Sequence, residues 1–348
     1  MGRQFIGKAD PKSGDKTKVW HRLTRRRFIW MVNAAVATGI AGKLFWNFNE
    51  GFLKAAVFVA KAVSYETNLE QIVRSGLEEL GLERRDVRGK SILLKPNLVE
   101  PDSASPHINT HPALVRAAAE VFRVWGAKEV FVAEGPGHVR DTQLVLDNSG
   151  FGTMLTEAGI PFVDLNYDNF RKIDNKLGLT SLSHLYLPES LFRADLIVSM
   201  PKMKTHHWAG FTLSMKNLFG VMPGLCYGWP KNVLHLEGIS KAILDITSTV
   251  QPDLAIVDGI VGMEGDGPIM GTPKPAGVVV MGTNPTSVDA TAVRLMGFDP
   301  YRANYLAYAA GVLGPVAESN IEQRGEPLAS LVTSFKLLDH PSMLHFRS

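Results

Sequence analysis

Residues 91–134 read SILLKPNLVEPDSASPHINTHPALVRAAAEVFRVWGAKEVFVAE, and this stretch decides the fold class. It opens with a short apolar run at 91–95 and closes with another at 129–133, each typical of a β-strand. Between them, residues 112–125 have helical periodicity, with a proline at the start and Gly126 just beyond the end. Uninterrupted apolar runs on either side of a helix predict strands that are covered on both faces, as in a parallel sheet.

The same alternation of strands and helices continues to about residue 300. Further strands are predicted at 161–165, 184–187, 196–200, 254–257 and 277–281, and further helices at 237–250 and 286–296. We therefore expect an α/β protein with a mostly parallel sheet sandwiched by helices. One large domain is expected over residues 89–300, after a helical lead-in at 63–88 and before a C-terminal extension at 301–348.

Near the N-terminus, residues 24–29 read TRRRFI, which fits the Ser/Thr-Arg-Arg-x-Phe-Leu pattern of a twin-arginine export signal. The uncharged run at 28–42 is shorter than the roughly 20 residues of a membrane-spanning helix. The pattern predicts the twin-arginine translocation machinery as a partner. Export would place the protein in the periplasm or anchored to the outer face of the cytoplasmic membrane. The alternative is a basic cluster ahead of an ordinary anchor helix.

A second apolar block follows at residues 52–63 and contains Ala60, Lys61 and Ala62, the A-x-A pattern of a cleavage site. Residues 1–62 are therefore assigned to the signal and a linker, with a membrane anchor if the segment is retained. Cleavage and retention both stay open. Retention favours a partner in the membrane or in a membrane-associated complex.

Charge and cysteine content argue against two classes of ligand. Residues 1–27 contain nine Lys/Arg and two Asp, a net charge of +7, so the +3 of the full chain leaves −4 for the rest. The basic character therefore belongs to the leader, and no nucleic-acid partner is expected. The sole cysteine, Cys226, excludes an iron–sulfur cluster held by cysteines alone.

Ligands in parallel sheets bind beyond the carboxyl ends of strands, and polar residues follow several of the predicted strands. Residues 201–220 place lysines and histidines among apolar side chains, although a solvated basic loop is the alternative. A lysine in apolar surroundings has a lowered pKa and can act as a base or nucleophile. The predicted catalytic residues are His206, His207, Lys216 and Glu134. The predicted binding residues for a small anion are Lys95, Asn97, Lys202, Lys204 and Asn217.

A glycine-rich segment at 258–268 contains Asp258, Glu264 and Asp266. Carboxylates suit a hard cation or proton transfer, and glycines let the backbone approach a ligand closely. These residues are therefore predicted to hold a divalent metal, with a plain glycine-rich turn as the alternative. Gly135-Pro-Gly137 lacks the third glycine of a dinucleotide-binding fingerprint.

Several motifs together resemble the DUF362 family, a domain of unknown function. They are Lys95-Pro-Asn97, Thr110-His-Pro112, Ala133-Glu-Gly135, the runs at 202–220 and 258–268, and Val288-Asp-Ala290 ahead of Gly297. The resemblance covers about residues 90–300. It implies a fold and a set of site residues, but it does not imply a particular reaction. Some members carry iron–sulfur modules, from which this chain departs because it lacks the cysteines.

A shorter segment, His207-Trp-Ala-Gly-Phe211 followed by Lys216, is similar to lactate-racemase-like enzymes. That resemblance implies Lys216 as the attachment point of a covalently held nucleotide-type cofactor, a nickel–pincer nucleotide, or as a base. It implies His206 or His207 as metal ligand or proton carrier. Two functions are therefore expected. One is a metal- or cofactor-dependent enzyme acting on a small anionic substrate; the other is a non-catalytic binding or accessory subunit of a membrane-associated complex.

Overall fold

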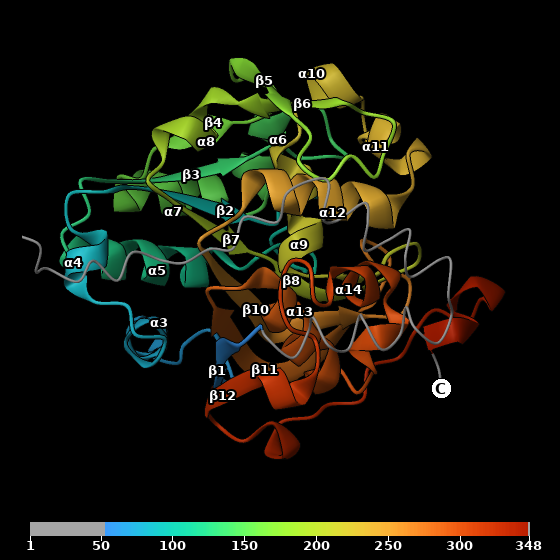
Figure 1. The fold of residues 1–348 in the computed structure, drawn as a ribbon. Coiled ribbons are helices and arrows are strands. Elements are labelled where there is room, and N and C mark those ends of the chain that lie inside the picture. The colour runs from blue at the N-terminus through green and yellow to red at the C-terminus, as the bar shows by residue number, and fades with distance from the viewer. Residues whose placement is uncertain (1–52, 347–348) are drawn as a thin grey trace, which may run out of the picture.

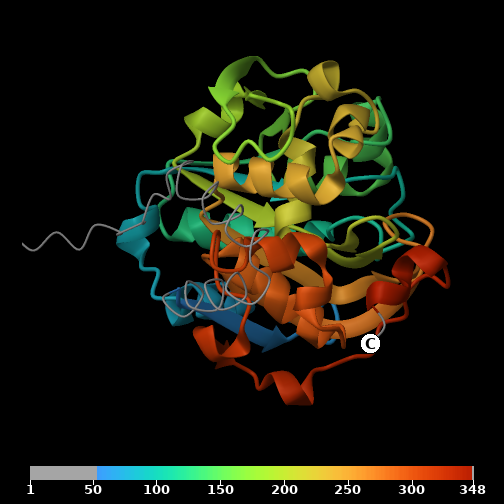
Figure 2. The same cartoon turned by 45° about the vertical axis from the view of Figure 1, so that its right-hand side comes forward.

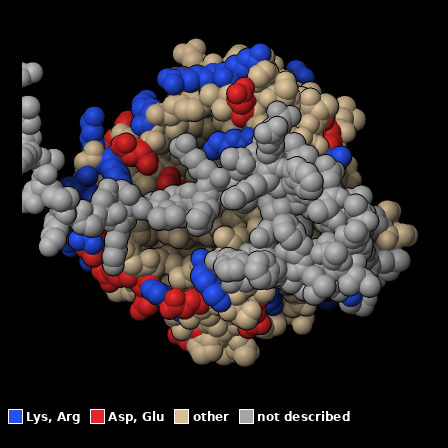
Figure 3. Space-filling model, in the orientation of Figure 1, with Lys and Arg blue, Asp and Glu red and all other residues tan. Residues whose placement is uncertain are grey.

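The computed structural model describes residues 53–346 (Figure 1). The predicted export signal at 24–42 lies outside these residues. Within 53–346, no helix is both long enough and apolar enough to cross a bilayer. On the face shown in Figure 3, Lys and Arg side chains lie among Asp and Glu over the described part of the surface.

A ten-stranded mixed sheet forms the centre of the described chain, with its main strands in the order β12-β1-β11-β10-β7-β2-β3-β4. These strands are β1 (Ala55–Lys61), β2 (Ser91–Pro96), β3 (Glu129–Glu134), β4 (Phe162–Asp164), β7 (Leu196–Met200), β10 (Leu254–Glu264), β11 (Thr272–Gly282) and β12 (Ile321–Gly325). Neighbours are parallel except at β11, which is antiparallel to both β10 and β1. The predicted mostly parallel sheet is confirmed.

Shorter elements complete the fold. Two further strands, β8 (Lys202–His206) and β9 (Gly210–Thr212), extend the sheet beside β10, while β5 (Phe170–Asp174) and β6 (His184–Pro188) form a separate antiparallel pair. The short helices are α4 (Arg84–Val87), α6 (Thr142–Asn148), α8 (Glu189–Arg193), α10 (Gly224–Tyr227) and α11 (Asn232–Leu236). The strand predicted at 184–187 is thus β6, outside the main sheet.

The sheet lies between two layers of helices (Figures 1 and 2). One layer contains α3 (Leu69–Glu79), α5 (Pro112–Val124) and α7 (Phe151–Ala158); the other contains α9 (Ser214–Asn217), α12 (Ile239–Val250), α13 (Pro285–Leu295) and α14 (Asn304–Ala309). Successive strand residues serve the two layers in turn. Ile92 and Leu94 belong to the buried cluster that includes residues of α3, α5 and α7, whereas Leu93 belongs to the cluster that includes residues of α9, α12, α13 and α14. This period of two is why each strand reads as an uninterrupted apolar run.

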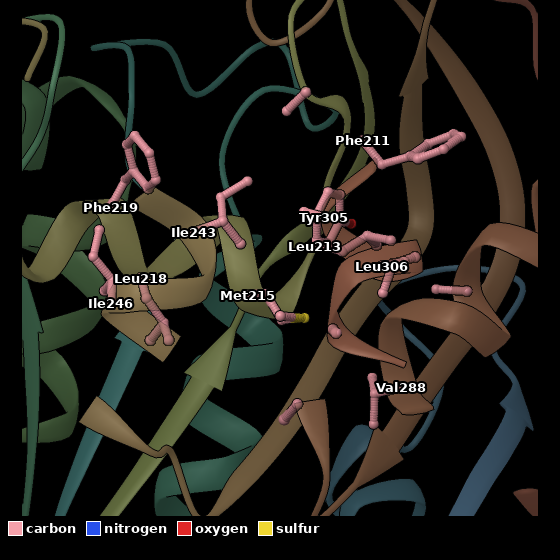
Figure 4. Packing of buried hydrophobic residues seen from close by; sticks show 14 of the residues in the cluster. Phe211, Leu213, Met215, Leu218, Phe219, Ile243, Ile246, Val288, Tyr305 and Leu306 are labelled. Carbon is pink, nitrogen blue, oxygen red and sulfur yellow. The ribbon is translucent and has the colours of Figure 1, made fainter. Parts of the chain in front are cut away.

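The helix α9 is only four residues long, so packing rather than length stabilises it. Its Met215 and the adjacent Leu218 belong to one buried cluster with Ile243 of α12 and Leu306 of α14 (Figure 4). A helix this short therefore has a fixed position against the sheet.

Two segments that were assigned outside the domain belong to the sheet. β1 lies between β11 and β12, with Val57 and Val59 fully buried, so the predicted boundary at residue 62 is wrong. β12 and α14 lie within the predicted C-terminal extension at 301–348, which is therefore part of the domain. β1 was not predicted because Lys54 and Lys61, at the two ends of its apolar stretch, made the segment resemble a weak membrane segment. β10 also runs on through 258–264, which was predicted as a loop.

β2 occupies the position at which the order of strand addition along the sheet reverses. From β2 the chain proceeds to β3 and β4 on one side, and later to β7 and β10 on the other. In α/β sheets a crevice opens at such a switch point, outside the carboxyl ends of the strands. Lys95 and Asn97 lie at this end of β2.

Candidate functional site

A cavity of about 380 Å³ lies at the carboxyl ends of β2 and β3. Its volume is in the range of ligand-binding pockets, which is roughly 300–1,000 Å³. Of the twelve predicted site residues, eight line it: Lys95, Asn97, Glu134, His206, His207, Lys216, Asn217 and Asp266. The switch point of the sheet therefore brings most of the predicted site together.

A buried ion pair forms the floor of the cavity. The Lys95 Nζ donates to Glu134 Oε2 at 2.6 Å, to the Pro96 carbonyl at 2.9 Å and to Asn217 Oδ1 at 3.2 Å. Burial lowers the pKa of Lys95, while the charge of Glu134 acts in the opposite direction. Gly220 packs directly against this pair, since a Cβ at that position would lie 1.9 Å from Glu134 Oε1.

Lys216 projects from α9 toward the cavity. Its Nζ lies 3.7 Å from the centroid of the Phe219 ring. Burial, helped by the charge of Lys95, lowers the pKa of Lys216 to about 7. Among residues 53–346 no carboxylate lies within ion-pair distance of this amine. Near neutral pH part of the amine population is therefore uncharged.

Asp289 of α13 holds the start of α9 in place. Its carboxylate accepts hydrogen bonds from the backbone N–H groups of Ser214 at 2.7 Å and Met215 at 3.0 Å. These are two of the N–H groups that a helix start leaves without intrahelical partners. Burial raises the pKa of Asp289 to about 7. Asp289 thus fixes the turn that carries Lys216.

His206 is held in one tautomer by the chain that follows it. Its Nδ1 accepts from the backbone N–H groups of Trp208 at 3.1 Å and Ala209 at 3.3 Å, so its proton resides on Nε2. Burial lowers its pKa well below the usual range. His206 is therefore a neutral hydrogen-bond donor. His207 lies nearer the mouth, with Nδ1 3.3 Å from Asp266 Oδ1.

Two functional residues were missed by sequence reasoning. Lys231 lines the cavity, is 2 % exposed and donates to the Met222 carbonyl at 2.6 Å; burial lowers its pKa to about 8. Its backbone has φ +70°, a left-handed conformation that is uncommon and strained outside glycine. The ring of His235 contacts those of Trp208 at 5.3 Å and Phe219 at 5.6 Å. Lys231 immediately precedes α11 and His235 lies within it, so neither follows a strand, and only the Pro230-Lys231 pair indicated a special turn.

Lys202 and Asp258 form a second buried ion pair outside the cavity lining. Lys202 Nζ donates to Asp258 Oδ2 at 2.6 Å. Asp258 also accepts from the Tyr65 hydroxyl at 3.0 Å and from the His111 backbone N–H at 2.9 Å. The Asp258 carboxylate therefore has its hydrogen-bond donors within the protein, and the pair stabilises the fold rather than lining the cavity.

The remaining predicted residues also have separate partners. Lys204 is fully buried behind the cavity wall and donates to the Pro268 carbonyl at 3.1 Å. Glu264 accepts from the Lys336 backbone N–H at 2.9 Å. Asp258, Glu264 and Asp266 thus do not gather into the predicted metal site. Nowhere in residues 53–346 do three His, Cys, Asp or Glu side chains lie close enough together to hold a metal ion.

The model of the family described as "Domain of unknown function (DUF362)" matches residues 92–294. This chain belongs to the DUF362 family. The thylakoid-associated protein sll1697 of Synechocystis sp. is 28% identical to it over 293 residues, an alignment that covers 81% of this chain and 87% of that protein. The membership predicted from the motifs is confirmed.

Two solved structures are weakly similar in fold. The lactate racemase apoprotein from Thermoanaerobacterium thermosaccharolyticum has a TM-score of 0.42 and 19% identity, with 61% of this chain and 51% of that chain covered. A protein from Thermotoga maritima has a TM-score of 0.40 and 12% identity, with 68% of this chain and 60% of that chain covered. The chain therefore spans about half of the racemase apoprotein and three fifths of the other protein.

Proposed function

We propose that this protein is an enzyme that transfers a proton on a small organic anion, with the amine of Lys216 as the base. The observation that carries the proposal is the state of this amine. It faces the cavity, its pKa is about 7, and it has no carboxylate partner among the described residues. An amine in that state can accept a proton near neutral pH, where general bases are most effective.

The other cavity residues fit complementary roles. Lys231 has no carboxylate within ion-pair distance in residues 53–346, and its pKa of about 8 leaves it mostly charged at pH 7. It would attract the anion, together with the Lys95 end of the floor pair. The fixed Nε2–H of His206 would stabilise negative charge on a substrate oxygen as the carbon loses its proton to Lys216.

Alternatively, Lys216 fits the expected attachment point of a covalently held nucleotide-type cofactor, in which case the bonded amine would not act as the base. The amine is partly neutral and faces a cavity of about 380 Å³, which leaves room for an attached group. When bound, such a group would supply the electron acceptor for the substrate carbon. The intact mass of protein purified from its native source tests this, because an adduct would map to the peptide that contains Lys216. A divalent metal held by protein side chains alone does not fit, since the carboxylates predicted for it lie apart.

Exchange of substrate hydrogen for deuterium tests the proposed proton transfer. The purified full chain is incubated in D₂O with a panel of 2-oxo and 2-hydroxy acids, and loss of the carbon-bound proton is followed by NMR. Exchange should occur with wild-type protein and with Lys172→Met, an exposed control on β5, and should be lost in Lys216→Met. Binding of the acids by calorimetry without any exchange would overturn the enzyme and favour the non-catalytic binding subunit.

We further propose export by the twin-arginine route to the periplasmic side, in solution or attached to the membrane. The support is the motif at 24–29, and the name of the Synechocystis relative describes that protein as thylakoid-associated. Fractionation of cells expressing wild-type protein and the Arg25→Lys, Arg26→Lys double variant tests this proposal. Equal recovery of the two proteins outside the cytoplasm would overturn it.

A further inference from the structure

The cavity has charged side chains buried at its floor, where Lys95 is fully buried and Glu134 and Lys231 are each 2 % exposed. Its exposed lining is mixed. Trp208 and Met270, which are 63 % and 78 % exposed, form the apolar part of the mouth, to which the polar His138 and Asp266 also contribute. Proteins ordinarily leave charges in water, so charges buried beneath exposed apolar side chains are an unusual arrangement.

The apolar mouth has a fixed shape on at least one side. The indole of Trp208 contacts the ring of His207 edge-on at 4.8 Å and that of His235 at 5.3 Å. Both contacts orient the indole although it is exposed. Leu98, Val99 and Ile269 also line the cavity, so apolar surface continues inward from the mouth toward the lysines.

The size of the cavity adds a second constraint. A volume of about 380 Å³ is within the range of pockets that bind drug-sized ligands, which are larger than a two- or three-carbon acid. A two- or three-carbon acid bound at the floor would leave the apolar walls in contact with water. A ligand with an apolar extension would remove that surface from water and gain affinity.

We propose that the natural ligand is an amphipathic anion, with its acidic group at Lys95 and Lys231, beside the base Lys216, and its apolar part along Leu98, Ile269 and Met270. This inference rests on the proposed function, because it names the substrate class of the same site. The shared chemistry is an acidic head on a hydrocarbon body, which occurs both in free acids and in membrane lipids.

Chain-length dependence of binding tests the proposal. Butanoate, hexanoate and octanoate are titrated calorimetrically into the full chain at pH 7. Each added methylene that enters the apolar mouth should tighten binding about fourfold. Trp208→Ser and Met270→Ser should flatten this dependence, whereas Tyr308→Ser, at a side chain that is 54 % exposed outside the cavity lining, should keep it. Thermal unfolding of each variant confirms that it folds.

The outcomes separate the two proposals. Equal affinity for all three acids, abolished by Lys231→Met, would overturn the amphipathic ligand and leave the anion site standing. Absence of binding by all three would overturn both. Co-sedimentation with phosphatidylglycerol vesicles, reduced in Trp208→Ser, would support a lipid as the source; octanoate binding without vesicle binding would support a free acid.

Discussion

The carboxylate of Asp289 accepts a hydrogen bond of 2.7 Å from the backbone N–H of Ser214, two residues before Lys216. The interaction joins α13 to α9 and thereby fixes the helix that carries Lys216, the proposed base. Asp289 does not line the cavity and acts through the position of the helix. The Val288-Asp-Ala290 motif can be understood in this way.

Replacement of Asp289 should disturb both the fold and the lysine. In Asp289→Asn an amide N–H₂ replaces one acceptor of the two backbone donors, so the free energy of unfolding should fall by about 1–3 kcal/mol. The pKa of Lys216 should also shift, which a purely structural defect elsewhere would not produce. Asp299→Asn is the control, because exposed Asp299 caps the Tyr301 N–H and asparagine caps equally well. An unchanged Lys216 pKa would contradict the positioning role.

Lys216 should titrate near neutral pH. Its amine becomes reactive only as it loses its proton, so acylation of Lys216 should rise with pH and reach half its maximum near the pKa of about 7. The measurement is competitive labelling with acetic anhydride between pH 5 and 11, read by peptide mass spectrometry, and a Lys216 midpoint near 10 would refute the proposed base.

Gly220 should resist substitution because it packs against the floor of the cavity. A Cβ there would lie 1.9 Å from Glu134 Oε1 and 2.6 Å from Lys95 Nζ. Gly220→Ala should therefore displace the ion pair, reduce stability by about 1–3 kcal/mol and weaken anion binding. Gly137→Ala is a matched control in the same cavity, since its Cβ would lie 3.8 Å from the nearest side-chain atom. Equal behaviour of the two variants in denaturant unfolding and octanoate binding would show that the floor is not constrained.

Lys202 should matter for stability rather than for the ligand. Lys202→Met leaves the Asp258 carboxylate buried without its counter-charge, which should reduce the free energy of unfolding by about 3–5 kcal/mol. The double variant Lys202→Met, Asp258→Asn removes that charge and should recover part of the loss. Urea unfolding measures both. Loss of octanoate binding by a folded Lys202 variant would return Lys202 to the binding site.

β1 should be indispensable. It buries Val57, Phe58 and Val59, which together contribute roughly 5–9 kcal/mol, comparable to the whole stability of many domains. A chain that begins at residue 63 should therefore fail to give a cooperative thermal transition, whereas one that begins at residue 53 should unfold cooperatively. Cleavage after Ala62 would remove this strand, so mature protein should retain it; a natural N-terminus at Val63 would contradict this expectation.

The sequence predicted the parts of the fold that depend on local pattern. The strands β2, β3 and β7 and the helices α5 and α13 were each recognisable from periodicity, and the position of β2 explains why Lys95 meets Glu134. β1 and β12 were not predicted because their strand pairing depends on residues more than 200 positions away, which no local pattern reports.

Site residues at or just beyond a strand end, such as Lys95 and Glu134, were predicted from the sequence. Those beside or within a helix, such as Lys231 and His235, were missed. Lys95, Glu134 and Lys216 come together because parallel strands end at one edge. Lys202 is only four residues from His206, yet it pairs with Asp258 and, like Lys204, does not line the cavity. Such a division depends on tertiary packing and cannot be deduced from a cluster of charges in the sequence.

The place of β1 between β11 and β12 also determines when the fold can be completed. During synthesis β1 emerges before any other strand of the described sheet, whereas both of its neighbours emerge near the end. For most of translation its apolar residues therefore lack their native partners. Contacts of such long sequence separation form slowly. The sheet can reach its final width only once residue 325 has left the ribosome, so its first strand waits for its last before the sheet is complete.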